Sequence, residues 1–282
     1  MSENYQLVRL VNGAFSVRSL AENETFHPVI GPAAEAEALY VNQLKLRERL
    51  RNHAGEFVVW DVGLGAAANV LAVIRAASEF PCPLRVISFD WTIEPLRFAV
   101  ENADKLGYLA GYEKILSEFI EQGRVSFSRV EWEWRPGDFP GLMKPNSPAL
   151  PPPHAILFDA FSPARNPAMW SAPLFRDLFR RLDPNRPCAM PTYSRSTMLR
   201  VTLLLAGFYV GVGHATGEKE ETTIAANSLE LLHEPLPTSW LQRVRKSKSA
   251  EPLREPVYRQ SPLSAESWEE LVQHPQFTSS RS

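Results

Sequence analysis

The chain has few cysteines, no strong excess of charge and no metal-binding spacing. Its two cysteines, Cys82 and Cys188, lie near no second cysteine or histidine, which predicts two reduced, buried thiols and no metal site. The six histidines form no pair at metal-ligand spacing either, and His27 and His154 are expected to be structural or surface residues. A formal net charge of -2 does not favour general nucleic-acid affinity, although a local basic face is compatible with it.

No segment has the length of a membrane span or the pattern of a signal peptide. Residues 1–6 are polar and no long apolar core follows them. We therefore expect a cytoplasmic protein with no membrane partner. A hydrophobic content of 44% in 282 residues is ordinary for a globular protein with one large domain, with or without appendages.

Short apolar runs alternate with helical segments along most of the chain. Such alternation predicts an α/β fold, in which helices cover both faces of a mostly parallel sheet. Strands are predicted over 57–60, 84–89, 125–134, 155–158, 188–191, 208–212 and 222–226. Helices are predicted over about 32–50, 95–106, 111–121, 169–182 and 196–205, and a further helix runs from the small-residue loop after the first of these strands to about residue 79. The seven strands end in an antiparallel hairpin, joined by residues 217–220.

Three parts are expected from the order of these segments. Residues 1–50 form an extension with a helix and a β-hairpin, whose two-residue turn is predicted at Asn12-Gly13. Residues 51–232 form the α/β domain. Residues 233–282 form a polar tail that contains the basic run Arg243–Lys248, and we expect a wrapping extension or a partly ordered appendage there.

Acidic residues follow successive predicted strands, at the sheet edge where α/β proteins bind ligands. A loop with Gly63 and Gly65 follows the first strand and opens the helix that carries Asn69. Glycine permits a positive φ and a close backbone approach to a ligand. Asp90 ends the second strand and can accept hydrogen bonds from ribose hydroxyls, while Asp138 follows the third and can accept one from an adenine amino group. The alternatives are a packing turn, a helix cap and a turn residue, respectively.

Together these features favour a nucleoside ligand. The loop lacks the third glycine of a dinucleotide fingerprint and the lysine of a P-loop, so it does not require a pyrophosphate. S-adenosyl-L-methionine is therefore favoured over NAD as the cofactor. The closing strand–turn–strand is how the sheet of a class I, Rossmann-like methyltransferase ends.

The most specific segment is FDAFSPARNPAMW, residues 158–170. A buried strand ends there at Asp159, and a loop with an aromatic ring and an arginine follows at once. The arrangement predicts a carboxylate at the ligand-binding edge. A plain loop cap is the alternative for Asp159.

This segment closely resembles the methyltransferase domain of the MnmC-type tRNA 5-methylaminomethyl-2-thiouridine biosynthesis proteins. The resemblance extends to VGLGAAAN, VISFDWTIEPL and GEKEETTIA, and it covers roughly residues 26–228. The FAD-dependent oxidase half of the bifunctional proteins has no counterpart in this sequence. The resemblance therefore implies a free-standing methyltransferase, with a separate FAD-dependent oxidase as a partner in the same pathway.

The resemblance implies N-methylation, dependent on S-adenosyl-L-methionine, of 5-aminomethyl(-2-thio)uridine at the wobble position of tRNA. Asp159 is then the catalytic residue that orients the attacking amine and takes its proton. Phe161 would stack on the extruded pyrimidine, and Arg165 and Asn166 would hold phosphate or base edges.

Two departures from the family pattern leave alternatives open. Ala66-Ala67-Ala68 replaces Thr-Gly-Leu, and alanine in place of the glycine is tolerable only at a negative φ. Glu220 stands where the family has arginine, which removes a phosphate contact. The chain could instead methylate another amine or nucleoside, or be a catalytically impaired binding module. A basic face continuous with the Asp159 loop would favour tRNA over a small acceptor.

Overall fold

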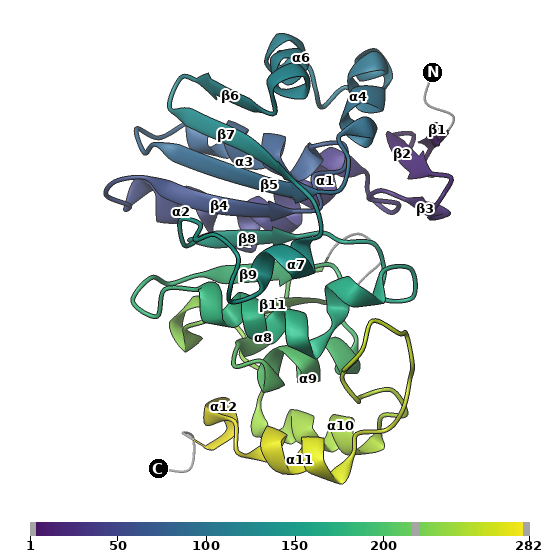
Figure 1. Cartoon of the computed structure of the whole chain (residues 1–282), viewed down its shortest axis with the longest axis vertical. Helices are drawn as coiled ribbons and strands as arrows, with labels where there is room; N and C mark the ends of the chain where they lie inside the picture. The colour runs from purple at the N-terminus through teal and green to yellow at the C-terminus, as the bar shows by residue number, and fades with distance from the viewer. Residues whose placement is uncertain (1–3, 216–219, 279–282) are drawn as a thin grey trace. The chain divides into compact units, whose positions relative to one another are not determined.

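The computed structural model describes residues 4–215 and 220–278 (Figure 1). The chain divides into two compact units. The first unit comprises Met1–Phe139, Ala155–Asp159 and His214–Glu220, and the second comprises Pro140–His154, Ala160–Gly213 and Glu221–Ser282. This boundary runs through the expected α/β domain, so the division into residues 1–50, 51–232 and 233–282 remains a prediction.

Five strands form the main sheet of the first unit, in the order β8-β4-β5-β7-β6. They are β4 (Phe57–Val62), β5 (Leu84–Asp90), β6 (Arg124–Phe127), β7 (Val130–Pro136) and β8 (Ala155–Phe158). All neighbours pair in parallel except β6 and β7. The single strand predicted over 125–134 is wrong, because the chain reverses near Ser128, whose φ is +52°. Strands β4 to β11 therefore number eight instead of seven.

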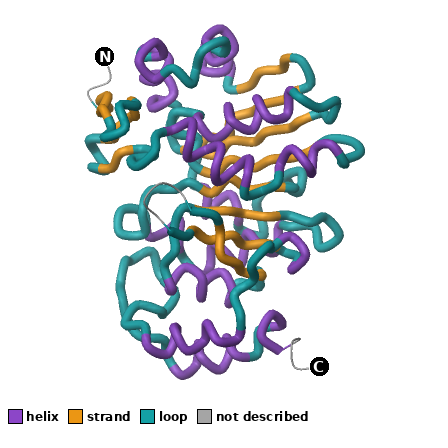
Figure 2. Tube along the Cα trace, turned by 180° about the vertical axis from the view of Figure 1, so that it is seen from behind, coloured by secondary structure: helices purple, strands orange, loops and turns teal. Residues whose placement is uncertain are grey.

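The helices of the first unit are shorter than the sequence predicted. They are α1 (Pro32–Ala36), α2 (Leu46–Arg51), α3 (Ala68–Ser78), α4 (Glu94–Glu101), α5 (Ala103–Leu106) and α6 (Glu113–Gln122). The helix predicted over 32–50 contains a π-helical turn, Glu37–Asn42, and is interrupted at Lys45, whose φ is +48°. Figure 2 shows α1, α2 and α3 together on one face of the strands. Every residue of β4 is buried.

The N-terminal extension forms a small antiparallel sheet of β1 (Tyr5–Arg9), β2 (Phe15–Ser19) and β3 (Glu24–Thr25). The predicted hairpin is confirmed, and Gly13 supplies a φ of +87°. The turn is longer than the two residues predicted, since the Leu10 N–H donates to the Ala14 carbonyl at 2.8 Å. After β3 the chain turns at Phe26 and His27 toward α1.

The second unit contains an antiparallel sheet in the order β9-β11-β10, with bounds β9 (Ala189–Thr192), β10 (Tyr209–Gly213) and β11 (Thr222–Ala226). The predicted terminal hairpin is thus confirmed, although Gly217–Lys219 of its connection lie outside the described residues. Helices α8 (Ala172–Arg181) and α9 (Thr197–Leu205) belong to this unit. The helix predicted from 169 begins instead at Ala172, because Pro167–Trp170 form a 3₁₀ turn and Ser171 caps α8.

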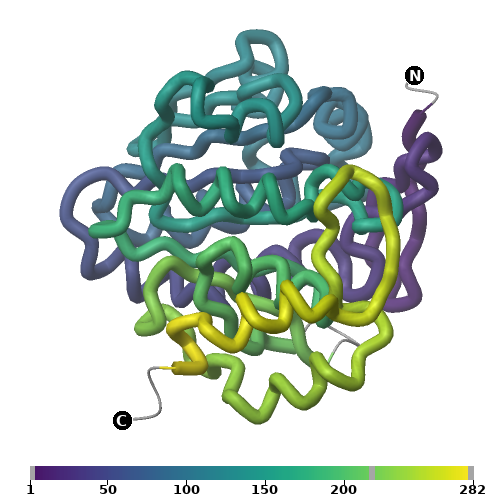
Figure 3. Tube along the Cα trace, turned by 60° about the horizontal axis from the view of Figure 1, so that its bottom comes forward, coloured from purple at the N-terminus to yellow at the C-terminus, as the bar shows by residue number. Residues whose placement is uncertain are grey.

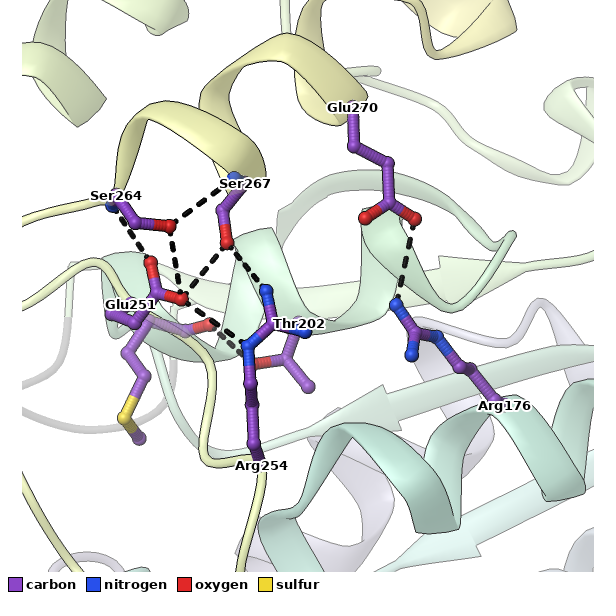
Figure 4. Close-up of polar contacts among 8 residues, drawn as sticks. Arg176, Thr202, Glu251, Arg254, Ser264, Ser267 and Glu270 are labelled. Carbon is purple, nitrogen blue, oxygen red and sulfur yellow. Dashed lines mark hydrogen bonds and ion pairs between the residues drawn. The ribbon is translucent and has the colours of Figure 1, made fainter.

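The tail contains short helices among its described residues. It contains α10 (Leu241–Lys246), α11 (Ala265–Val272) and α12 (Pro275–Thr278), and short 3₁₀ turns precede α10; Figure 3 brings this region forward. The loop before α11 is fixed at its base, where Glu251 contacts Ser264, Ser267 and Arg254, as Figure 4 shows. α7 (Phe139–Met143) is a single short turn.

Two further expectations concern the cysteines and membrane spans. Cys82 and Cys188 are both buried and not joined in a disulfide, as predicted. In the part of the chain that the structure describes, no helix is long and apolar enough to cross a membrane.

Candidate active site

The predicted cofactor residues and Asp159 lie at one edge of the first unit's sheet. Since β4, β5, β7 and β8 run parallel, their carboxyl ends meet at that edge. Each of these strands has a predicted site residue at or just after its carboxyl end: Gly63 and Gly65 for β4, Asp90 for β5, Asp138 for β7 and Asp159 for β8. Asn69 lies in the first turn of α3. The topology therefore brings residues that are far apart in sequence to one edge.

The loop after β4 needs glycine for both conformation and space. Gly63 has a φ of +94° and Gly65 a φ of +49°. A Cβ on Gly65 would lie 3.4 Å from the Phe26 ring, so a side chain would crowd the ring as well as strain the backbone. The Gly65 N–H donates to Asp90 Oδ2 at 3.0 Å. Burial raises the pKa of Asp90, and this hydrogen bond opposes the rise.

The altered glycine position in this loop adopts a strained conformation. Ala67, which stands in place of the family's glycine, has a φ of +61° and caps α3. The condition for tolerating alanine here, a negative φ, is therefore not met. A non-glycine residue in the left-handed region costs about 1–2 kcal/mol. The loop nevertheless closes, with the Ala67 N–H donating to the Leu64 carbonyl at 2.8 Å.

Asp159 is held in place from three directions. Its N–H donates to the Val62 carbonyl at 2.9 Å, which extends the pairing of β8 with β4. Its Oδ2 accepts a hydrogen bond from Asn69 Nδ2 at 2.8 Å and lies 3.6 Å from His27 Nε2. Just before it, the Phe158 carbonyl accepts the hydroxyl of Tyr40 at 3.2 Å. Both side-chain contacts use Oδ2, so Oδ1 is directed to neither partner.

His27 is a site residue that the sequence pattern did not reveal. It was expected to be a structural or surface residue, but its imidazole is only 9% exposed and faces Asp159, which is 21% exposed. The backbone at His27 has a φ of +48°, and the preceding Phe26 packs on Gly65. The N-terminal extension thus covers the glycine loop with one residue and reaches the carboxylate with the next. Only the start of the family resemblance near residue 26 pointed to this.

Asp61 is a second missed residue, buried at the end of β4. Its Oδ2 accepts the Ser88 hydroxyl at 2.7 Å, and Ser88 in turn accepts the Trp132 Nε1–H at 2.9 Å. Burial raises its pKa to about 8, with smaller contributions from Asp159 and Asp90 that oppose ionisation. Within the described residues, Asp61 Oδ1 and Asn69 Oδ1 are buried without a hydrogen-bond donor.

These features fit S-adenosyl-L-methionine. Its ammonium can donate to buried oxygens that otherwise lack donors, and its positive charges favour the ionised form of neighbouring carboxyls. The positive-φ glycines allow close approach of the ligand to the backbone. The contact of Asp90 with ribose hydroxyls remains a prediction. Asp138 is exposed at the same edge, and its adenine contact remains a prediction.

The loop after Asp159 belongs to the second unit and carries the predicted acceptor residues. Its carbonyls are held by two aromatic side chains: Tyr193 donates its hydroxyl to Ala160 at 3.0 Å, and Trp170 donates its Nε1–H to Phe161 at 2.7 Å. The two rings meet edge to face at 5.8 Å. Arg165 is exposed, and Phe161 and Asn166 are half-buried, so all three are accessible in part.

Comparison with known proteins agrees with this geometry. Residues 147–228 match a family model described as S-adenosyl-L-methionine-dependent methyltransferase. The chain is 25% identical over 238 residues to the tRNA 5-methylaminomethyl-2-thiouridine biosynthesis bifunctional protein MnmC of Methylibium petroleiphilum, covering 80% of this chain and 35% of that protein. It is 32% identical over 232 residues to the MnmC protein of Pseudomonas savastanoi pv. phaseolicola, covering 74% and 33%.

The fold is also similar to that of a solved structure. The MnmC2 structure from Aquifex aeolicus aligns with a TM-score of 0.71 and 21% identity, covering 98% of this chain and 85% of that one. The chain is thus similar to the methyltransferase part of the MnmC proteins. This confirms the class I, Rossmann-like fold and S-adenosyl-L-methionine as the cofactor of the methyltransferase domain. The chain spans about a third of the length of the curated MnmC relatives.

Proposed function

We propose that this chain methylates the exocyclic amine of 5-aminomethyl(-2-thio)uridine at the wobble position of tRNA. The MnmC relatives, whose names place them in tRNA 5-methylaminomethyl-2-thiouridine biosynthesis, support this acceptor. A cytoplasmic location and a separate FAD-dependent oxidase that supplies the substrate belong to the same proposal. The observation that carries it is the carboxylate of Asp159, fixed through one oxygen by Asn69 and turned toward His27.

Asp159 is proposed to hold and deprotonate the acceptor amine. When bound, S-adenosyl-L-methionine supplies an electrophilic methyl group on a sulfonium. As the amine nitrogen forms the new N–C bond, the methyl–sulfur bond would break and leave its electron pair on a neutral thioether; the methylated amine must then lose one proton. Asp159 Oδ1 can accept a hydrogen bond from the amine, because its contacts with Asn69 and His27 both use Oδ2. The proton can pass from Asp159 to His27 Nε2, 3.6 Å away, and from there to solvent.

Phe161, Arg165 and Asn166 are proposed to receive the nucleotide. An extruded pyrimidine can stack on the Phe161 ring, and Arg165 can pair with a phosphate. The Phe161 and Ala160 carbonyls are fixed by Trp170 and Tyr193, which lowers the entropy lost when the loop binds its substrate.

The test is transfer of labelled methyl from S-adenosyl-L-methionine into tRNA that carries 5-aminomethyl-2-thiouridine. We expect label at the wobble nucleoside with wild type and about 10²–10⁴-fold slower transfer with Asp159→Asn. His27→Asn should slow transfer less. Calorimetry with the cofactor should show retained binding by both variants. Label confined to small amines, or wild-type rates with Asp159→Asn, would contradict the proposal.

A further inference from the structure

A polar depression lies in the second unit between the start of α9 and the tail helix α10. Its volume is about 620 Å³, and it is lined by Thr197, Ser239, Gln242, Arg243, Lys246 and Ser247. Two of these six side chains are cations, three are hydroxyls and one is an amide, and none is a carboxylate. A lining in which every side chain can donate a hydrogen bond suits an anion.

Among the described residues, the acidic partner of Arg243 is Glu221, which also contacts a second guanidinium. Glu221 Oε1 lies 3.4 Å from Arg243 Nη1 and also 3.4 Å from Arg200 Nη1. Arg200 is buried and donates its other hydrogen bonds to the Thr222 carbonyl and Thr223 Oγ1. One carboxylate therefore faces two guanidiniums, and Lys246 adds a further positive charge. This excess is available to a bound anion.

The elements that form the depression are held in place by side-chain contacts. Arg245 of α10 lies over the Trp268 ring of α11, 4.2 Å from its centroid. The loop that joins these helices is fixed by the Glu251 cluster, and α11 is tied to α8 by the 3.5 Å contact of Glu270 with Arg176 (Figure 4). The described helices of the tail are therefore packed within the second unit, and most of the basic run is part of an ordered helix.

A short segment, from Tyr193 to Thr197, connects the loop that carries Phe161 with the depression. Tyr193 donates its hydroxyl to the Ala160 carbonyl, and α9 begins four residues later at Thr197. Four residues span at most about 14 Å when fully extended. The intervening Arg195 is exposed and contributes another positive charge.

We propose that this depression binds a phosphodiester group of the RNA whose nucleotide occupies the Phe161 loop. The inference rests on the proposed function for the identity of the RNA, and it assigns a role to the tail. Arg243 and Lys246 pair with the phosphate oxygens, and the hydroxyl and amide side chains complete the hydrogen bonds. The nearly neutral charge of the whole chain is then no obstacle, because the cations are concentrated where the backbone passes.

The test compares two charge-matched double variants in RNA binding without cofactor. R243Q/K246Q removes two cations of the depression, whereas K105Q/K114Q removes two exposed cations from helices of the first unit. The probe is an anticodon stem-loop RNA, titrated by fluorescence anisotropy at several salt concentrations. For R243Q/K246Q we expect Kd to rise roughly tenfold and the slope of log Kd against log salt to fall by about 1–2. The control pair should change both quantities far less.

Further arms keep the result interpretable. Lys246→Gln alone leaves the contact of Arg243 with Glu221 intact and should give part of the same effect if the double variant folds poorly. Equal losses in the two double variants, an unchanged salt slope in R243Q/K246Q, or no RNA binding by wild type would overturn the inference. Tight binding of inorganic phosphate, with RNA affinity unchanged in R243Q/K246Q, would assign the depression to free phosphate and also overturn it.

Binding and methyl transfer separate this inference from the proposed function. A depression-dependent salt slope, together with no methyl transfer into tRNA, would support the RNA site and contradict only the proposed acceptor. Methyl transfer into tRNA with no effect of R243Q/K246Q on RNA binding would support the acceptor and contradict this site.

Discussion

The two units fix the backbone on either side of Asp159 by different means. In the first unit, the loop after β4 depends on backbone conformation, with Gly63, Gly65 and Ala67 all at positive φ. In the second unit, no residue of the loop over 160–170 has a positive φ, and aromatic side chains fix its carbonyls instead.

This difference follows from what each loop is proposed to contact. A loop that presents backbone N–H groups to a compact cofactor benefits from small residues and tight turns. A loop that binds a nucleotide through its side chains needs those side chains exposed, so its backbone must be fixed by hydrogen bonds from other residues. The loop after β4 contains a strained backbone residue and lies beside a buried carboxyl. The loop over 160–170 is instead held by side-chain hydrogen bonds, and each of these can be removed by a single substitution.

The largest expected effect concerns the buried carboxyl of the first unit. The pKa of Asp61 is raised by burial from 3.8 to about 8 in the folded state, so the folded protein keeps a proton that the unfolded chain releases above about pH 4. This group's contribution to the free energy of unfolding is therefore full at acid pH and falls between about pH 4 and 8, by about 1.4 kcal/mol per pH unit. Asp61→Asn, which removes this titration, should exceed wild type in stability by a margin that grows with pH.

Urea denaturation across that pH range measures the margin. Asp138→Asn is the matched control, because it removes an exposed carboxyl from the same sheet edge. The margin over wild type should grow with pH more for Asp61→Asn than for this control. If the free energy of unfolding of Asp61→Asn and of wild type changed equally with pH, Asp61 would be ionised in the folded protein and accessible to solvent.

Two tyrosine hydroxyls offer an intermediate test of the comparison. Tyr40 donates to the carbonyl before Asp159 from the first unit, and Tyr193 donates to the carbonyl after it from the second. Replacing either by phenylalanine removes one hydrogen bond at nearly constant volume and should cost about 1 kcal/mol of stability. We expect Tyr40→Phe mainly to lower kcat, since it loosens the carboxylate, and Tyr193→Phe mainly to raise KM for tRNA.

Steady-state kinetics with saturating cofactor separate the two effects, and each variant serves as the control for the other. If both variants changed kcat and KM in the same proportion, the two sides of Asp159 would act as one element, and the comparison would fail.

The sequence predicted which residues lie at the carboxyl edge of the first unit's sheet, but it did not predict the contacts that other segments make with them. The strand ends at Asp90 and Asp159 could be read from short apolar runs that stop at an acid, because strand polarity alone brings them together. His27 could not be found in this way, since it reaches Asp159 through a hairpin distant in sequence. The reversal near Ser128 and the break at Lys45 were missed because neither is a glycine, although both have positive φ.

The smallest expected effect tests the strain in the first unit's loop. Ala67→Gly relieves about 1–2 kcal/mol of left-handed strain. It also loses a buried methyl, worth about 0.8 kcal/mol, and adds roughly 0.4–1 kcal/mol of unfolded-state entropy. These terms nearly cancel, so its stability should stay within about 1 kcal/mol of wild type. Ala72→Gly, a buried alanine inside α3 with no such strain, should lose about 2 kcal/mol.

Urea denaturation measures the difference in the free energy of unfolding between the two variants. This difference isolates the strain, because each substitution removes one buried methyl, Ala67 at the cap of α3 and Ala72 inside it. Equal losses would mean that Ala67 relaxes to negative φ in solution. The glycine loop would then be held by side-chain packing, as the loop over 160–170 is, and the contrast between the two sides of Asp159 would disappear.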